Sequence, residues 1–383
     1  MTPLINTLAD LVRVNSVNPA YGDGGSEANV TPLLREFFHH RGIETFEQEV
    51  FPGRHNLIAR LPGKTQRRLV LEAHTDTVSI KNMTIPPFEP TIREGRVYGR
   101  GAVDDKAGVA AMMHAVASVK ADGIVPMWEV WMAAVVDEEF TYRGVVKLCE
   151  GLQAEAAIVA EATELRAVIA SKGVLRLRII TRGKAAHSSK PQMGNNAITH
   201  MSRLVLALEE ENARLDAHTH PMLGSPTLSV GVIRGGVQVN FVPDQCAIEV
   251  DRRLLPGERA VEVIAHYQSV LDAMKIVHPD FDAFIEAPPL LVDEALSTPA
   301  DAAVVQCARQ VLRGLGLNEQ PCGVPYGSDA SKLSRAGIPS IIFGPGSIDQ
   351  AHAADEYVEI VQVEQAAAFY RQFILSQPRQ ITS

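Results

Sequence analysis

The sequence has few cysteines, and they are not clustered. The four cysteines, Cys149, Cys246, Cys307 and Cys322, lie far apart and form no C-x-x-C pair. This spacing excludes a disulfide framework and a cysteine-based zinc site, and it favours a reducing compartment. Residues 1–19 also lack the basic start, apolar run and cleavage site of a secretory signal peptide. We therefore expect a cytoplasmic protein.

Long apolar runs and blocks of one charge are also missing. The most apolar stretches, such as residues 125–136, are short and contain the charged Glu129. A membrane-spanning helix, in contrast, needs roughly 20 mostly apolar residues. The chain has 36 basic and 45 acidic residues, for a net charge of -9, and no basic block. We therefore expect neither a membrane nor a nucleic acid as a partner.

Two motifs that are common in hydrolases are absent. The chain has no G-x-S-x-G elbow, and residues 343–348 (Phe-Gly-Pro-Gly-Ser-Ile) do not form one, which disfavours a serine hydrolase. The zinc motif H-E-x-x-H is absent too. The pair His218 and His220 precedes Pro221 and is typical of a surface turn.

The pattern of apolar residues divides the chain of 383 residues into three zones. Up to about Ser171, continuous apolar runs such as 131–136 alternate with helical patterns, which is typical of strands buried on both faces. From about Lys172 to Pro288, apolar and charged residues alternate in strands that are separated by two helical stretches. The first pattern then returns. We predict an α/β domain with a mostly parallel sheet (residues 1–171 and 289–383), interrupted by a smaller α+β, ferredoxin-like domain (residues 172–288).

Polar residues follow the buried apolar runs at the points where the expected strands end. In open α/β sheets, ligands collect beyond the carboxyl ends of the strands, so we expect these side chains to meet at one edge. A further carboxylate lies in a glycine-punctuated loop, residues 99–108, that leads into a helix. The residues in question are His74, Asp76, Asp104, Glu138, Glu139, Glu161 and His352.

Two imidazoles and three carboxylates are the donors that bind zinc or a similar divalent ion. Five protein ligands exceed the needs of one open catalytic site, so two metals that share a bridging carboxylate would explain the surplus. Asp76 lies two residues after His74, on the same strand face, where it can orient the imidazole. Glu138 and Glu139 point in opposite directions, so one can hold metal while the other takes a proton. The pattern indicates a metal-assisted hydrolase.

Each of these signals also has an ordinary structural interpretation. A single histidine at a strand end is commonly structural, and Asp104-Asp105 can cap a helix. The pair Glu138-Glu139 can lie at a solvated loop end. The inference of a metal site therefore depends on the combination of signals.

The sequence resembles the zinc aminopeptidase-like family that includes acetylornithine deacetylase, succinyl-diaminopimelate desuccinylase, aminoacylase and glutamate carboxypeptidase. The resemblance covers nearly the whole chain, and the matching stretches follow the order of the family's signatures. They are residues 74–76, 99–106, 137–139, 184–189, 251–257 and 351–357. Stretches 186–189 and 351–355 look closer to the acetylornithine deacetylase branch. Where many members read Glu-Pro-Thr, this chain has Glu161-Ala-Thr163, so its loop lacks the fixed φ of proline.

The resemblance implies a role for each donor. Asp104 would bridge two zinc ions, and cobalt or manganese would be alternatives to zinc. His74 and Glu161 would complete one site, and Glu139 and His352 the other. Glu138 would be the general base.

The resemblance also implies that the inserted domain is a dimerisation lid. Its histidine, His187, would cross the interface of a homodimer to help bind the scissile carbonyl in the partner subunit, although a polar strand end is the ordinary interpretation. Arg253 is a candidate for gripping a substrate carboxylate, with an exposed strand charge as the equal alternative. Asn240 is a candidate carbonyl donor, with an ordinary structural role as the equal alternative. Gly327 and Ser328 lie in a turn that resembles the segment receiving the substrate carboxylate.

We therefore expect a metal-dependent hydrolase that cleaves the amide bond of N-acyl L-amino acids, with a metal-bridging water as nucleophile and Glu138 as base. A carboxypeptidase or dipeptidase with the same metals is the close alternative. A noncatalytic amino-acid-binding protein is a further alternative, but such a protein would be expected to have lost Glu138 or a ligand, and none is lost.

Overall fold

The computed structural model describes residues 2–376 and divides into two units. The second unit comprises Ala170–Leu296 and Gly323–Gly327, and the first unit contains the rest of the described chain. The insertion therefore begins at residue 170 rather than 172 and ends at 296 rather than 288. The sequence assigned residues 323–327 to the first domain. They belong to the second unit because Val324 accepts a backbone hydrogen bond from Lys172 and Gly327 packs against Asp293.

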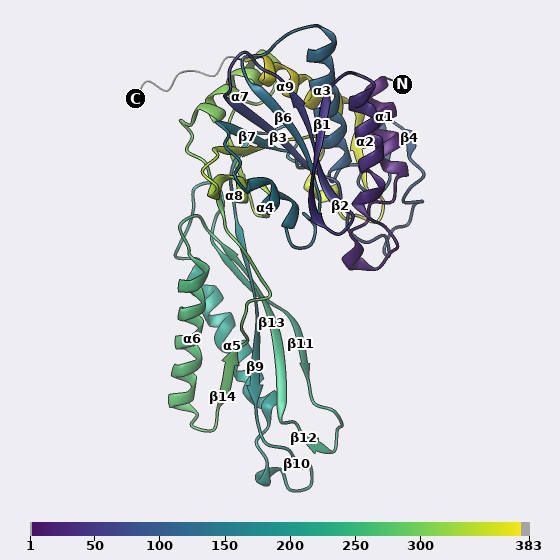
Figure 1. Ribbon diagram of the computed structural model, residues 1–383. Helices are drawn as coiled ribbons and strands as arrows, with labels where there is room; N and C mark the ends of the chain where they lie inside the picture. The colour runs from purple at the N-terminus through teal and green to yellow at the C-terminus, as the bar shows by residue number, and fades with distance from the viewer. Residues whose placement is uncertain (1, 377–383) are drawn as a thin grey trace. The chain divides into compact units, whose positions relative to one another are not determined.

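A nine-stranded sheet forms the centre of the first unit (Figure 1). Its four central strands, in the order β6-β3-β7-β18, are parallel, whereas β1, β2 and β8 pair antiparallel at the flanks. The predicted α/β class is confirmed, with parallel pairing confined to the centre of the sheet. The strands are β1 (Glu44–Phe51), β2 (Arg54–Leu61), β3 (Arg68–His74), β6 (Glu129–Val135), β7 (Ala156–Val159), β8 (Val168–Ser171), β16 (Leu296–Ser297), β17 (Cys322–Val324) and β18 (Ser340–Ile342).

Helices cover both faces of this sheet (Figure 1). Five helices bury their apolar faces in one core with alternate residues of the strands: α1 (Pro3–Arg13), α2 (Thr31–His39), α3 (Lys106–Ala121), α7 (Ala303–Gly314) and α9 (Ile360–Leu375). On the other face, α4 (Arg143–Cys149) packs on β2 and β6, and α8 (Ala330–Arg335) packs on β7 and β18. No helix within residues 2–376 is long and apolar enough to cross a membrane.

Helix α3 is buried on nearly all sides, which its sequence permits because its residues are small. Gly108 is the tightest point, since a Cβ there would lie 2.6 Å from the Cβ of Ala160 and 2.3 Å from Asp105 Oδ1. Only glycine therefore lets the start of α3 approach the end of β7 so closely. This approach places the loop before α3 at the carboxyl edge of the sheet.

The strands that directly precede this loop in the sequence belong to a small sheet. Strand β5 (Arg96–Tyr98) pairs with β4 (Thr91–Arg93) and β19 (Tyr357–Glu359), and Tyr98 is opposite Tyr357. The pairing brings two chain segments about 260 residues apart into contact. Residues 99–104 follow one strand of the pair, and residues 352–356 precede the other.

The second unit has the predicted order of strand, helix, two strands, helix and strand. These are β9 (Gly173–Arg182), α5 (Ala197–Leu215), β11 (Thr227–Gly235), β13 (Gln245–Leu254), α6 (Ala260–Val277) and β14 (Asp282–Ile285), and the sheet order is β11-β13-β9-β14, with β15 (Leu291–Asp293) also on β9. Both helices pack on one face of the sheet, and the pairing is antiparallel, as in a ferredoxin-like α+β fold. A separate two-stranded ribbon joins β10 (Ala186–His187) to β12 (Phe241–Val242).

Candidate metal centre

The parallel strands of the first unit end at a common edge, and the expected donors follow those ends. His74 is the last residue of β3, Glu139 lies four residues beyond β6, and Glu161 lies two beyond β7. His352 lies in the connection after β18, and Asp104 precedes α3. The topology thus delivers five donors from five segments to one edge of the sheet.

Asp104 lies between the two histidines. His74 Nε2 is 2.9 Å from Asp104 Oδ1, and His352 Nε2 is 3.1 Å from Asp104 Oδ2. Each oxygen of one carboxylate therefore faces a different imidazole. This is the arrangement expected of a carboxylate that two metal ions share.

Two overlapping sets of donors result. His74, Asp104 and Glu161 form one set and Asp104, Glu139 and His352 the other, and in each set the ligand atoms lie within 4.8 Å of one another. The first set is buried, whereas the side chain of His352 is 53% exposed. The second set therefore lies nearer to solvent.

The electrostatics of these residues fit divalent cations. Burial raises the pKa of Glu161 well above its usual value, and the nearby charges of Asp104 and Glu138 raise it further. Burial and the charge of Asp104 raise the pKa of Glu139 to about 7, while hydrogen bonds with Asp104 and Glu139 raise the pKa of His352 to about 10. Buried carboxylates this close repel one another unless a positive charge lies among them. Imidazole nitrogen and carboxylate oxygen are also the donors that zinc prefers.

Glu138 belongs to neither donor set. Burial raises its pKa well above the usual value, and the charges of Asp329 and Glu139 add to that effect. A carboxyl group with a raised pKa is suited to accept and return a proton near neutral pH. Glu139 thus belongs to a donor set and Glu138 does not, and the division of roles between them stays a prediction.

Asp76 contacts the imidazole mainly through its backbone. His74 Nδ1 lies 3.1 Å from the backbone oxygen of Asp76 and 3.6 Å from Oδ1. The Asp76 carboxylate instead accepts backbone N–H bonds from Glu138 and Glu139, both at 3.1 Å. Burial would raise the pKa of Asp76, but its interactions with His74 and further hydrogen bonds lower it overall. Asp76 therefore connects the two donor sets.

The loop after Glu161 is fixed although residue 162 is an alanine and not a proline. The Thr163 hydroxyl donates to the backbone oxygen of Gly344, at 3.2 Å, and the Gly344 N–H donates to the Thr163 hydroxyl, at 3.0 Å. A Cβ at Gly344 would lie 2.5 Å from the backbone oxygen of Glu161. Thr163 and Gly344 therefore hold Glu161 in place by hydrogen bonding and close packing.

A buried ion pair, which sequence reasoning missed, supports the Asp104 loop. Glu356 Oε2 accepts from Arg100 Nη1 at 2.5 Å, and Oε1 accepts from the backbone N–H groups of Val103 and Asp104 at 3.0 and 3.3 Å. Both side chains are almost fully buried. Arg100 and Glu356 each lie inside a stretch that resembles a family signature, which marks the two residues as candidates, but their pairing joins segments 256 residues apart.

The predicted lid residues His187 and Asn240 lie together in the second unit. His187 in β10 is exposed, and its Nδ1 is 2.8 Å from Ser189 Oγ. The backbone oxygen of Asn240 accepts from Ser188 N at 3.0 Å, which joins the two loops. Both side chains are accessible.

The other predicted substrate contacts lie elsewhere. Arg253 pairs with Val174 at the start of β9, whereas the ribbon with His187 follows the end of β9, and Arg253 Nε donates to Asp251 at 2.7 Å. Gly327 belongs to the second unit and Ser328 to the first. Ser328 is fully buried, and its Oγ accepts from Ala330 N at 3.3 Å. The structure thus does not bring Arg253 together with His187.

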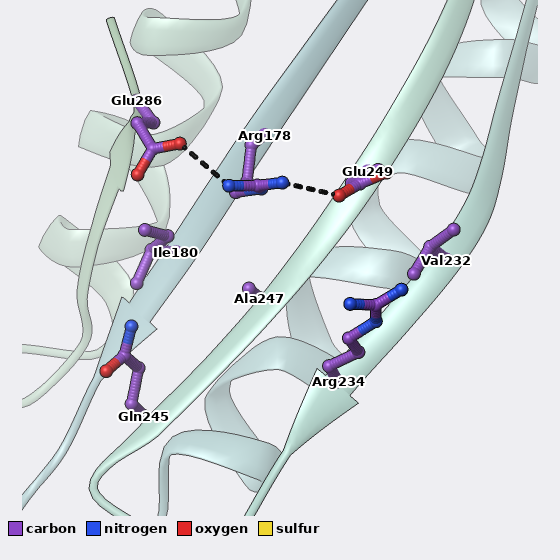
Figure 2. Close-up of a pocket in the computed structure, with 8 residues that line it drawn as sticks. All are labelled: Arg178, Ile180, Val232, Arg234, Gln245, Ala247, Glu249 and Glu286. Carbon is purple, nitrogen blue, oxygen red and sulfur yellow. Dashed lines mark hydrogen bonds and ion pairs between the residues drawn. The ribbon is translucent and has the colours of Figure 1, made fainter. Parts of the chain in front are cut away.

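A hollow of about 270 Å³ lies on the open face of the sheet in the second unit (Figure 2). Arg178 crosses it and pairs with Glu249 at 2.7 Å and Glu286 at 3.3 Å. None of the predicted site residues lines it. Its central arginine is satisfied within the sheet, so we assign it no catalytic part.

Comparisons with known proteins agree with this geometry. The profile of peptidase family M20/M25/M40 matches residues 70–376. An acetylornithine deacetylase of Myxococcus xanthus is 32% identical over 314 residues, which cover 80% of this chain and 79% of the relative. Among solved structures, a tripeptidase from Staphylococcus aureus has a TM-score of 0.79 at 24% identity and covers 97% of both chains. A dinuclear metal-binding peptidase from Bacillus subtilis has a TM-score of 0.71 at 17% identity, over 97% of this chain and 96% of the other.

Proposed function

This chain belongs to the peptidase family M20/M25/M40, and from that membership and the geometry of its donors we propose that it hydrolyses the amide bond of N-acyl L-amino acids. The similarity to acetylornithine deacetylase, at 32% identity, supports the deacylase class. The products would be a carboxylic acid and a free amino acid. The first unit would be the catalytic domain, and the second a dimerisation lid.

The position of Asp104 carries the proposal. Its two oxygens face two histidines, and Glu161 and Glu139 each complete a set of three donors. We propose that His74, Asp104 and Glu161 hold one divalent cation and that Asp104, Glu139 and His352 hold the other. Zinc matches these donors best, and cobalt or manganese are alternatives.

When bound, the two cations would acidify water and polarise the substrate carbonyl. Glu138 would take the proton from the attacking water and then deliver it to the departing amine nitrogen. Its separation from the donor sets and its raised pKa support this role. Asp76 would hold Glu138 and Glu139 in register through their backbone N–H groups.

His187 would act on substrate in a homodimer. It is exposed on the ribbon of the second unit, beside Asn240, where it is accessible to a partner subunit. We propose that it donates a hydrogen bond to the carbonyl oxygen of substrate held by that partner, which stabilises the developing negative charge. The dimer would be cytoplasmic and would bind neither nucleic acid nor membrane.

The substrate carboxylate has several candidate partners. Arg253 offers a planar guanidinium, but it already pairs with Asp251, so substrate would compete with that ion pair. Gly327 and Ser328, in the turn before α8, are further candidates. Asn240 would contact the acyl carbonyl.

A carboxypeptidase or dipeptidase is the second candidate, because the chain shares its fold with the tripeptidase from Staphylococcus aureus. Both activities use the same metals and the same general base. They differ in whether the group on the carbonyl side of the cleaved bond is a simple acyl group or an amino acid.

Release of free amine from a substrate panel tests the proposal. The panel contains N-acetyl, N-succinyl and N-formyl amino acids together with dipeptides, and zinc-loaded protein is compared with chelator-treated protein. We expect chelator-sensitive release from one acyl class. Release from dipeptides alone would establish the second candidate, and no release from a protein with two bound metals would refute both.

A further inference from the structure

Asn18 is a fully buried polar residue in the first unit, 58 residues from Asp76 in sequence. It precedes the short helix η1 (Pro19–Tyr21), and its Oδ1 accepts from Ala20 N at 3.1 Å as the N-cap of that helix. Its backbone N–H donates to the backbone oxygen of Thr77 at 2.9 Å. These contacts place the Asn18 amide beside the carboxyl end of β3.

Both hydrogens of this amide are used on carboxylates. Nδ2 donates to Asp76 Oδ2 at 2.8 Å and to Asp137 Oδ1 at 3.0 Å. Asp76 and Asp137 are themselves buried. A side-chain amide is the neutral group that donates two hydrogens from one nitrogen, so it can bridge two carboxylates without adding charge.

The bridge connects directly to the proposed base and a proposed ligand. The Asp76 oxygens accept the backbone N–H groups of Glu138 and Glu139, both at 3.1 Å. Asp137 lies next to Glu138 and has a φ of 69°, a left-handed conformation that turns the chain directly after β6. Asn18 therefore contacts both the carboxylate that holds this turn and the residue that makes it.

Asp137 is also held from its other side. Arg54 Nη2 lies 3.2 Å from Asp137 Oδ1 and 2.5 Å from Glu27 Oε1, and the Asp137 N–H donates to Glu27 at 3.2 Å. The Thr141 hydroxyl donates to Asp137 Oδ2. Glu27, Arg54 and Thr141 therefore hold Asp137 in place, and Asn18 connects Asp137 to Asp76 by hydrogen bonds.

We propose that Asn18 is a positioning residue for the hydrolytic reaction: by donating to Asp76 and Asp137 together, it fixes the carboxylate that holds the backbone of Glu138 and Glu139. This inference rests on the proposed function. The Asn18 amide donates to Asp76 and Asp137, which are not among the five proposed metal donors, so its effect passes through Asp76. Residues that orient metal ligands from outside typically change metal affinity or activity by roughly 10- to 100-fold when they are replaced.

Two substitutions separate the donor role of Asn18 from its capping role. Asn18→Asp keeps an acceptor for Ala20 but removes both donors and adds a negative charge. Asn18→Ser also keeps a capping oxygen, retains a single donor and adds no charge, so it avoids the burial of a third carboxylate. The matched control is Asn29→Asp, since Asn29 lies in the same N-terminal region but is exposed, and its Nδ2 donates to the backbone oxygen of Asn15 at 2.8 Å.

The experiment measures kcat and KM on the best substrate, Zn²⁺ affinity by competition with a chromophoric chelator, and Tm for wild type and the three variants. For Asn18→Asp and Asn18→Ser we expect kcat and the affinity for the weaker Zn²⁺ to fall by at least about 10-fold, with KM nearly unchanged. Asn29→Asp should match wild type in kcat, KM, Zn²⁺ affinity and Tm.

Wild-type kcat and Zn²⁺ affinity in a variant with a lowered Tm would overturn the proposal, because Asn18 would then serve folding alone. If Asn18→Asp fails to fold, the same measurements on Asn18→Ser decide the question. If wild type hydrolyses nothing in the panel, the proposed function fails, but the Zn²⁺ affinities still decide the role of Asn18: weaker binding in Asn18→Ser supports it and equal binding refutes it.

Discussion

Removing the arginine of the buried Arg100–Glu356 pair should destabilise the first unit strongly. Both side chains are at most 2% exposed, so Arg100→Met would leave the Glu356 carboxylate buried without its cation. Loss of one partner from a buried ion pair typically costs about 3–5 kcal/mol. Glu356 would keep its N–H bonds from Val103 and Asp104, so we expect a loss near the lower limit, about 3 kcal/mol at neutral pH.

The loss should depend on pH in a defined direction. Burial raises the pKa of Glu356, and the charge of Arg100 opposes that rise. Without Arg100 the pKa rises further, and a carboxyl group whose folded pKa is raised is best tolerated when it is protonated. The contribution of Glu356 to the deficit of Arg100→Met should therefore be smallest at acidic pH, where Glu356 is protonated in both proteins. It should grow as pH rises from the folded pKa of wild type toward the higher folded pKa of the variant.

Urea unfolding followed by tryptophan fluorescence measures this loss, because Trp128 and Trp131 are both in the first unit. The full comparison is a cycle of wild type, Arg100→Met, Glu356→Gln and the double variant. Removing both charges should cost less than the sum of the single changes, with a coupling of about 2 kcal/mol or more. A coupling near zero, or a deficit that does not change with pH, would refute the reasoning.

Three further predictions concern the proposed site and a titrating histidine. Glu138→Ala should lower turnover by about 10²–10⁴-fold while metal analysis still finds two ions per chain; loss of metal would mean that Glu138 and Glu139 have exchanged roles. His187→Ala should lower turnover without affecting metal loading, and mixed dimers with His352→Ala should regain activity; no recovery would refute action across the interface. Burial lowers the pKa of His114, whose Nε2 lies 2.8 Å from Thr7 Oγ1, to about 4, so stability should fall as pH drops below the usual pKa of histidine. Since His114 is partly exposed, we expect the free energy of unfolding, measured with urea, to fall by at most about 2 kcal/mol. If the free energy of unfolding of His114→Gln falls with acidification as steeply as that of wild type, the prediction is wrong.

The gathering of the five donors could be predicted because each one follows a strongly patterned strand or precedes a clear helix. Parallel strands end at one edge, so His74 and Glu161 had to meet there once the α/β pattern was recognised. The family membership that the sequence indicated is confirmed by the profile match. The roles of the individual residues remain predictions.

What the sequence did not reveal depends on contacts between distant segments. Glu356 lies more than 250 residues from Val103 and Asp104, and Asn18 lies 58 from Asp76, so no local pattern predicts either contact. The segment Gly323–Gly327, which belongs to the second unit, is too short to show a periodic pattern of apolar residues. The contact of Asp76 with the peptide groups of Glu138 and Glu139 also depends on the turn at Asp137. The left-handed backbone of Asp137 cannot be predicted from the presence of an aspartate alone.

The way the chain enters and leaves the second unit has an evolutionary consequence. The main excursion begins after Ile169 and ends before Ser297, on the neighbouring strands β8 and β16, and Thr298 N donates to Ile169 O at 2.8 Å. All five proposed metal donors belong to the first unit. Because the two ends of the excursion meet, its length and content are free to vary without displacing a donor. A change within this insertion can therefore alter the proposed lid and its His187 while all five proposed metal donors keep their places in the first unit.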